Sequence, residues 1–332
     1  MINRENWKLV NKYLMYREQV LQNDPKTIRS GWGALRHVLE WADSTEFPHV
    51  MKLRPTLPDY ILTARADGKK EQLSPARMEK ILAFSRDLFE WLRIEYPSSY
   101  RTITASWIES LRVRRSHNSQ SRLVRRQFWT LQDVETVLDY PTTSLKHRRD
   151  KAAIAFIFLS AMRGAAFVTM PIKAVDLQKR KVYQLPEWGV ATKNSKAAIT
   201  FLLPIPKLLE VVEDWDTYIR NAAESDRTMW YARITPDGEN VKADSDNSTP
   251  AGRRTAMYEG LKELCKLTGI EWKSPHKIRH GHGVYGVKHA RTMAEYKALS
   301  QNMMHDTVET TDKTYSVLVN DDVGDIISTF TP

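Results

Sequence analysis

Apolar residues recur every three or four positions along most of this chain, which is the spacing of helices that bury one face in a core. Two such segments lie in the first hundred residues, at 24–43 and 73–97. Each has an aspartate or a serine directly before a proline, a pair that caps and starts helices. The pattern predicts a helical N-terminal domain over residues 1–110.

A second region begins at residue 128. Thr130 and Asp133 have the spacing of a capping box, in which each side chain bonds the other residue's backbone N–H. A continuous apolar run predicts a buried helix over 150–162 that ends at Arg163. Helices are also expected over 207–222 and 250–268, and from 276 to the end of the chain, including a C-terminal helix at 321–330.

Between residues 181 and 206 the pattern changes. β-Branched residues in partial alternation mark three segments, which Pro, Gly and Asn turn signals separate. We expect three short antiparallel strands, at 181–185, 188–194 and 196–206. The predicted fold is therefore mainly α with a small antiparallel β-sheet, in two domains that cover 1–110 and 128–332.

The segment between these domains, 111–127, carries no acidic residue and no sustained periodicity. An exposed linker would explain its Ser, Asn and Gln residues, but not its one-sided charge. A connector of this charge is suited to run along the phosphate backbone of DNA. We expect six arginines here to bind DNA: Arg112, Arg114, Arg115, Arg122, Arg125 and Arg126.

Composition favours a globular protein with a polyanionic partner. The 332 residues include 10 Trp, and 50 Lys and Arg against 40 Asp and Glu give a net charge of +10. The single cysteine, Cys265, excludes an internal disulfide and fits a reducing compartment. The chain opens on a polar segment, and its longest apolar run is well short of the ~20 residues of a membrane span. A cytoplasmic, nucleoid-associated protein is expected, without a membrane segment.

Four separated segments together hold six candidate site residues. An arginine follows the buried helix, where a charge is costly without an anionic partner. A lysine lies at the predicted hairpin, and a histidine and an arginine share one face at the start of a helix. A second histidine and, ten positions later, a tyrosine follow near the end of the chain. In chain order these residues are Arg163, Lys193, His276, Arg279, His305 and Tyr315.

Each of these residues, taken alone, has a simpler interpretation. Arg163 could be a structural ion-pair partner, Lys193 a surface lysine and Tyr315 a core aromatic. Lys196 lies on the same hairpin as Lys193 and could take its place. Two histidines four positions apart in the helix have metal-ligand spacing, but a zinc site needs further ligands, and HExxH and CxxC motifs are absent from the sequence. We expect no metal.

In this order and setting, the six residues resemble the signature of the tyrosine recombinases, the phage-integrase family, over residues 128–320. That signature is an arginine after a buried helix, a lysine on a β-hairpin, His-x-x-Arg, a later His or Trp, and a nucleophilic tyrosine. The resemblance implies a two-domain, C-shaped DNA clamp, in which 1–110 is the core-binding domain and 128–332 the catalytic domain. The apolar stripe of the C-terminal helix could fold back on its own core, but the resemblance favours packing on a neighbouring protomer.

The resemblance assigns a role to each site residue. Tyr315 would be the nucleophile that forms a 3′-phosphotyrosyl bond with DNA, and Lys193 the acid that protonates the leaving 5′ oxygen. Arg163 and Arg279 would neutralise the charge that builds on the phosphate, and the two histidines would add hydrogen bonds to it. Because the covalent link conserves the energy of the broken bond, neither a metal nor ATP is needed, and no cofactor is expected.

Two positions depart from the family pattern. Ala166 stands where the family usually carries an acid that helps to orient the site, and Met304 replaces the usual glycine before the second histidine. Neither change removes a charged catalytic residue. A divergent but active member is expected.

The expected function is site-specific recombination that integrates, excises or resolves a mobile element or a phage. The expected partners are double-stranded target DNA and further copies of the chain, in a homotetramer when two sites are joined and as a monomer or dimer when free. An accessory protein would be compatible with this scheme. Three alternatives stay open: a type IB topoisomerase-like enzyme, a non-catalytic DNA-binding protein and a metal-dependent nuclease.

Overall fold

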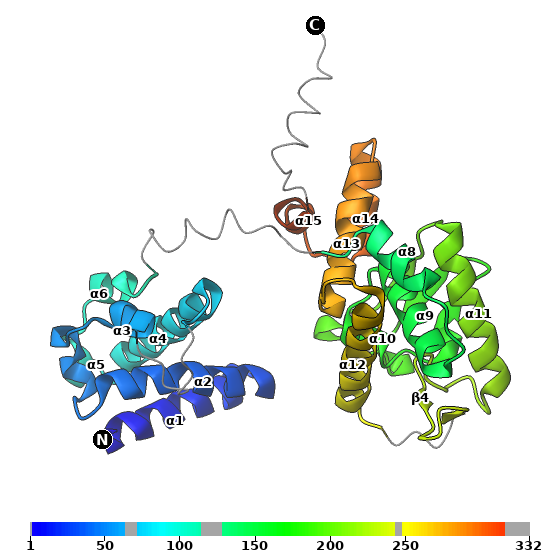
Figure 1. The fold of residues 1–332 in the computed structure, drawn as a ribbon. Coiled ribbons are helices and arrows are strands. Elements are labelled where there is room, and N and C mark those ends of the chain that lie inside the picture. The colour runs from blue at the N-terminus through cyan, green and yellow to red at the C-terminus, as the bar shows by residue number, and fades with distance from the viewer. Residues whose placement is uncertain (1, 64–71, 114–127, 243–247, 316–332) are drawn as a thin grey trace, which may run out of the picture. The chain divides into compact units, whose positions relative to one another are not determined.

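The computed structural model describes residues 2–63, 72–113, 128–242 and 248–315, with side chains up to Asp312 (Figure 1). The chain forms two compact units, Met1–Arg125 and Arg126–Pro332, and their division falls within the segment expected to be a linker. Both units are mainly helical, and the second also holds a small antiparallel sheet. The predicted fold class is therefore confirmed. No helix in the described ranges combines the length and the apolar character that crossing a bilayer demands.

The first unit is a cluster of helices around one apolar core. The Asp24 carboxylate accepts a hydrogen bond from Lys26 N at 2.7 Å, and the Ser74 hydroxyl accepts one from Arg77 N at 3.3 Å, so both predicted helix starts are real caps. The apolar stripes of the two helices that they start pack together in the core. The elements are α1 (Arg4–Gln19), α2 (Pro25–Ala42), η1 (Phe47–Lys52), α3 (Leu57–Thr63), α4 (Pro75–Glu95), α5 (Pro97–Tyr100) and α6 (Ala105–Ser110).

The second unit is built around one central helix, α9 (Leu145–Ser160), whose side chains from Ala152 to Leu159 are all buried. The prediction that this helix ends at Arg163 is wrong. Ala161 has a left-handed backbone with φ 54°, which stops the helix at Ser160. The other helices are α8 (Leu131–Asp139), α10 (Gly164–Phe167), α11 (Pro206–Ala222), α12 (Pro250–Thr268), α13 (Pro275–His289), α14 (Met293–Asn302) and α15 (Val308–Tyr315). Helices α11, α12 and α13 pack around α9 (Figure 1).

The small sheet consists of β1 (Val175–Asp176), β2 (Lys181–Gln184) and β3 (Ala198–Phe201), antiparallel and in that order. The predicted strand at 188–194 is wrong, because positive φ values at Gly189 and Asn194 interrupt an extended backbone there. Two short 3-10 turns, η4 (Pro186–Trp188) and η5 (Lys193–Ser195), take its place. A long β2–β3 hairpin loop therefore carries Lys193. A separate pair of short strands, β4 (Arg233–Ile234) and β5 (Val241–Lys242), lies before α12.

Candidate active site

The C-terminal end of α9 is completed by side chains of α13. The last carbonyls of a helix have no partner within it, so other groups must supply donors. Nδ1 of His282 donates to the Phe158 carbonyl at 2.6 Å. Nη1 of Arg279 donates to the Ala161 carbonyl. The helix that begins with the His-x-x-Arg sequence is thereby fixed to the end of the buried helix.

A close approach of backbones holds α13 in this place. A Cβ at Gly281 would lie 1.9 Å from the Trp129 carbonyl oxygen, so only glycine fits without movement of the main chain. Trp129 N donates to the Lys277 carbonyl at 3.2 Å, and its Nε1 donates to the Lys273 carbonyl at 3.0 Å. The segment before α8 and the start of α13 therefore form one rigid support for the site.

Arg163 precedes α10, three residues beyond the end of α9, and is partly exposed. Its charge acts on both candidate histidines. The pKa of His276 and the pKa of His305 are lowered, first by burial, then by Arg279, and further by Arg163. The structure thus brings the two arginines and the two histidines of the sequence prediction into one cationic cluster.

Arg279 is the buried centre of this cluster, with 3% of its surface exposed. Its Nη2 donates to the Met303 carbonyl at 2.5 Å and to Nε2 of His305 at 3.1 Å, while Nη1 reaches the Ala161 carbonyl. A guanidinium keeps its charge at any working pH, and its planar donors fix its direction. Arg279 therefore ties together the end of α9, the end of α14 and the second histidine.

His305 is held neutral by its neighbours. Burial, followed by the charges of Arg279 and Arg163, lowers its pKa to about 4. Because Arg279 donates to Nε2, the ring proton is on Nδ1, which donates to Oγ1 of Thr311 at 2.8 Å. Thr311 lies in α15, the helix that ends at Tyr315.

His276 lies on the exposed side of the same cluster. Its Nε2 is 3.1 Å from Nε2 of His280, one turn further along α13, and the two rings meet edge to face at 4.7 Å between centroids. One nitrogen of this pair donates and the other accepts. Burial, then the charges of Arg279 and Lys277, lowers the pKa of His276. The ring is therefore neutral at pH 7 and has a nitrogen that can accept a proton.

Two lysines of the hairpin differ in their surroundings. Nζ of Lys196 forms an ion pair with Oδ1 of Asp306 at 3.0 Å. Within the described residues, no ion pair or hydrogen bond engages the Lys193 ammonium, although its charge, after that of Lys196, helps to lower the pKa of Asp306. Asp306 directly follows His305. Both lysines are therefore near the cluster, and the Lys193 side chain is exposed.

Several predicted residues lie wholly or partly outside the described ranges. Tyr315 is the last residue of α15, and its side chain is outside them. The C-terminal helix at 321–330 also falls outside. Of the six linker arginines, only Arg112 is described; it is exposed and lies 3.7 Å from Glu109. The others outside the described ranges are Arg114, Arg115, Arg122, Arg125 and Arg126.

Three residues of this region were not predicted from the sequence. Thr311 lies four positions before Tyr315, on the same face of a helix, and that spacing is a signal that could have identified it. Asp306 is adjacent to His305, but its ion pair spans 110 residues. Asn302 contacts β3 over 101 residues, which no local pattern reveals.

The two departures from the expected signature have clear surroundings. Ala166 is buried in α10, with 1% of its surface exposed. Met304 has a left-handed backbone with φ 52°, a conformation that favours glycine. Among the described residues, no three His, Cys, Asp or Glu side chains are grouped so that they could hold a metal ion.

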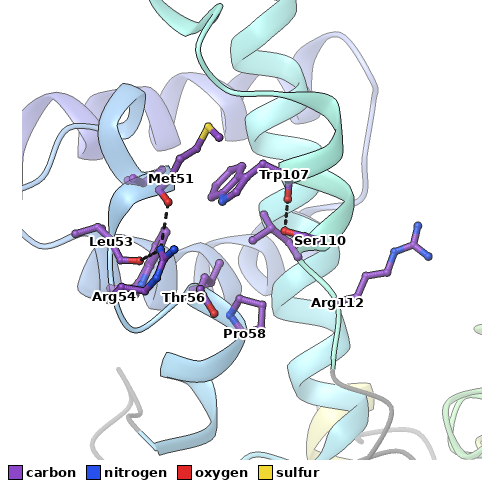
Figure 2. A pocket seen from close by; sticks show the side chains of 12 residues that line it. Met51, Leu53, Arg54, Thr56, Pro58, Trp107, Ser110 and Arg112 are labelled. Atoms are coloured by element: carbon purple, nitrogen blue, oxygen red, sulfur yellow. Dashed lines mark hydrogen bonds between the residues drawn. The ribbon is translucent and has the colours of Figure 1, made fainter.

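The first unit contains a separate cavity of about 330 Å³ between the η1–α3 segment and α6 (Figure 2). Nη1 of Arg54 donates to the Leu53 carbonyl at 2.8 Å, and Trp107 lies across the cavity from it. The Arg112 side chain points away from the other labelled side chains (Figure 2). The cavity is mostly apolar, and the Arg54 charge at its edge is held by its own loop.

The fold is similar to that of several solved structures. It matches the Tn1549 transposon integrase in complex with circular intermediate DNA, with a TM-score of 0.61 and 12% identity over 97% of this chain and 98% of that one. It matches a lambda integrase dimer bound to a COC′ core site, with a TM-score of 0.60 and 12% identity over 93% and 76% of the two chains. It also matches the XerH site-specific recombinase bound to its difH substrate, with a TM-score of 0.60 and 15% identity over 96% and 83%.

A search of the curated proteins finds no match. The family model described as "Phage integrase family" matches residues 127–320, more than half of the chain. This range contains Arg163, Arg279, His276 and His305, the four residues that the structure gathers into one cluster. The chain therefore belongs to the phage integrase family of tyrosine recombinases.

Proposed function

We propose that this protein is a site-specific DNA recombinase that cuts and rejoins DNA through a 3′-phosphotyrosyl intermediate. The observation that carries the proposal is the cluster around Arg279. The buried guanidinium of Arg279 contacts His305, and the charges of Arg279 and Arg163 lower the pKa of both histidines. Such a concentration of fixed donors suits a phosphate that gains negative charge in its transition state.

In the proposed reaction, Oη of Tyr315 attacks the phosphorus atom while the bond from phosphorus to the 5′ oxygen breaks. Arg163 and Arg279 bind the non-bridging oxygens, and His276 takes up the phenol proton. Lys193 gives a proton to the 5′ oxygen, which leaves as a hydroxyl. The reverse reaction, with a 5′ hydroxyl from another strand, rejoins the DNA without ATP, since the phosphotyrosyl bond keeps the energy of the original one. Neither step needs a metal.

The proposed partner is double-stranded DNA, with the linker arginines on its backbone. Three observations support this: the net charge of +10, the run of six arginines without an acid at 111–127, and a fold shared with proteins solved as DNA complexes. We also propose that four copies assemble on two sites. The product would be the integration, excision or resolution of a mobile element.

The test is a covalent trapping assay. Duplexes that the protein binds are first selected from a random library, and a nick is then placed near the scissile phosphate so that the released fragment diffuses away. We expect a denaturation-resistant protein–DNA band that Tyr315→Phe abolishes and that a chelator leaves unchanged. An adduct that survives in Tyr315→Phe would overturn the assignment of the nucleophile. Binding without any adduct would instead indicate a DNA-binding protein, and relaxation of plasmids that lack the site would indicate a topoisomerase.

A further inference from the structure

The outer edge of β3 is covered by a side chain rather than by a strand. The sheet order β1-β2-β3 leaves β3 with one paired edge in the described part of the chain. Phe201 N donates to Oδ1 of Asn302 at 2.7 Å, and Nδ2 of Asn302 donates to the Phe201 carbonyl at 2.9 Å. The amide of Asn302 therefore gives Phe201 the same two hydrogen bonds that a neighbouring strand would give.

The register explains why Phe201 can accept this partner. Phe201 is opposite Lys181 in the antiparallel β2–β3 pair. In an antiparallel ladder, alternate residues direct both backbone groups away from the partner strand. Phe201 is such a residue, since its N–H and C=O both reach Asn302. Replacement of the amide would leave both groups without these partners.

Asn302 lies close to the active-site loop along the chain. It is the last residue of α14 and is three positions before His305. The loop that follows is tightly fixed, because Met304 N donates to the Gln301 carbonyl at 2.8 Å and the His305 N donates to the Ser300 carbonyl at 3.2 Å. A hydrogen-bonded tie at Asn302 therefore sets the position of β3 relative to His305 and Arg279.

The same strand carries the Lys193 loop at its other end. Lys193 lies five residues before β3. The second tie between the hairpin and the His305 loop is the Lys196–Asp306 ion pair, whose side chains are 49% and 77% exposed. Solvent screens ion pairs with this exposure, so they add little to stability. The two bonds from Asn302 are also exposed, but they hold the main chain of β3 itself, whereas the ion pair joins the ends of two flexible side chains.

We propose that Asn302 is a positioning residue for Lys193. It docks the β2–β3 hairpin onto the end of α14, so that the ammonium reaches the leaving oxygen of the phosphate that Arg279 and His305 bind. This inference rests on the proposed function, in which Lys193 protonates the 5′ oxygen. Asn302 makes no contact with the substrate in this proposal and acts through the strand.

The chemistry of the leaving group supplies a test. An alkoxide is a poor leaving group and needs the proton of Lys193, whereas a thiol ionises with a pKa of about 8.5, so a thiolate leaves unprotonated. A selected duplex is made with sulfur in place of the bridging 5′ oxygen, and covalent adduct formation is timed on both duplexes. We expect Asn302→Ala to slow cleavage of the oxygen duplex by about tenfold to a hundredfold, the effect of a small misplacement. On the sulfur duplex its rate should approach that of the unaltered protein.

Two other variants make the outcomes separable. Lys193→Ala should show the same rescue by sulfur, and a failure of that rescue would refute the role of Lys193 in the proposed function. Suppose that sulfur rescues Lys193→Ala. If Asn302→Ala is then slowed equally on both duplexes, or is slowed on neither, the role of Asn302 is overturned while that of Lys193 stands. Gln301→Ala, a change at the exposed neighbour in the same helix, should leave both rates unchanged. Thermal unfolding of each variant establishes that it is folded at the assay temperature.

Discussion

Nη2 of Arg279 donates a hydrogen bond to Nε2 of His305 over 3.1 Å. Since a guanidinium offers no lone pair, Nε2 must be the acceptor, and the neutral ring carries its proton on Nδ1. That proton is donated to Thr311, whose side chain is fully buried in α15. One imidazole therefore joins the buried arginine to the helix that ends at the proposed nucleophile.

The hydroxyl of Thr311 should contribute to stability as the acceptor for His305. Thr311→Val keeps the shape of the side chain but leaves Nδ1–H without this partner, which should lower the free energy of unfolding by about 1 kcal/mol. Thr311→Ser retains the oxygen and should keep that contribution, apart from the lost methyl group. Urea unfolding of the three proteins measures both effects. If the valine variant were as stable as the natural protein, the hydrogen bond from His305 to Thr311 would make no net contribution to the free energy of unfolding.

Binding of DNA should be coupled to proton uptake at His305. Its pKa of about 4 reflects burial and the charges of Arg279 and Arg163, against which Asp306 acts only weakly. A phosphate placed beside the ring favours the charged form and raises this pKa, and the added proton on Nε2 requires that Arg279 turn its donor from this nitrogen to the phosphate. Between pH about 4 and 6.5, the complex should therefore bind more protons than the free protein. Calorimetry in buffers of different ionisation enthalpy measures this uptake, which should be smaller in His305→Gln.

His282 should make the protein sensitive to acid. The ring is completely buried, burial lowers its pKa to about 4, and its Nε2 has no hydrogen-bond partner in the described structure. In the unfolded chain His282 therefore takes up a proton near pH 6.5, whereas in the folded chain it does so only near pH 4. The contribution of this group to the free energy of unfolding is fully present above about pH 6.5. It is lost as the pH falls from 6.5 to 4, by on the order of 3 kcal/mol in total.

The matched variant is His282→Asn, because an amide nitrogen can still donate to the Phe158 carbonyl but does not titrate in this range. The difference in free energy of unfolding between natural protein and variant should shrink or reverse as the pH is lowered from 7 to 4. Equal pH dependence in the two proteins would show that His282 is not the group responsible.

Local signals in the sequence identified most of the helices. The caps at Asp24, Ser74 and Thr130 are present, and the helix predicted over 250–268 has those limits in the structure. These signals involve residues close together in the chain, so the sequence displays them directly. The resemblance to a family signature then identified the arginines and histidines that the structure gathers.

Features that depend on distant contacts were not predicted. The helix expected to reach Arg163 fails at Ala161, whose positive φ its side chain does not reveal in advance, whereas the strand expected at 188–194 fails at Gly189 and Asn194, two residue types that adopt positive φ readily. The Ala161 carbonyl is satisfied by Arg279, 118 residues away. The roles of Thr311 and Asn302 likewise depend on which segments meet in the fold, and hydrophobic periodicity carries no information on that.

The backbone at Met304 provides the last prediction, because it separates the effect of the main chain from that of the side chain. Met304 has φ 52°, while its side chain is 8% exposed. Alanine and glycine both remove the buried side chain beyond Cβ, but only glycine adopts this conformation without strain. We expect Met304→Gly to be more stable than Met304→Ala by about 1 kcal/mol.

Met303 is the matched control, since it is also buried and is adjacent, but has φ −76°. At that position alanine should be more stable than glycine, because the flexible glycine loses more entropy on folding. Denaturation midpoints of the four variants give both differences. If alanine were more stable than glycine at both positions, the left-handed backbone before His305 would carry no measurable strain. Methionine would then suit position 304 as well as the glycine that the family usually has.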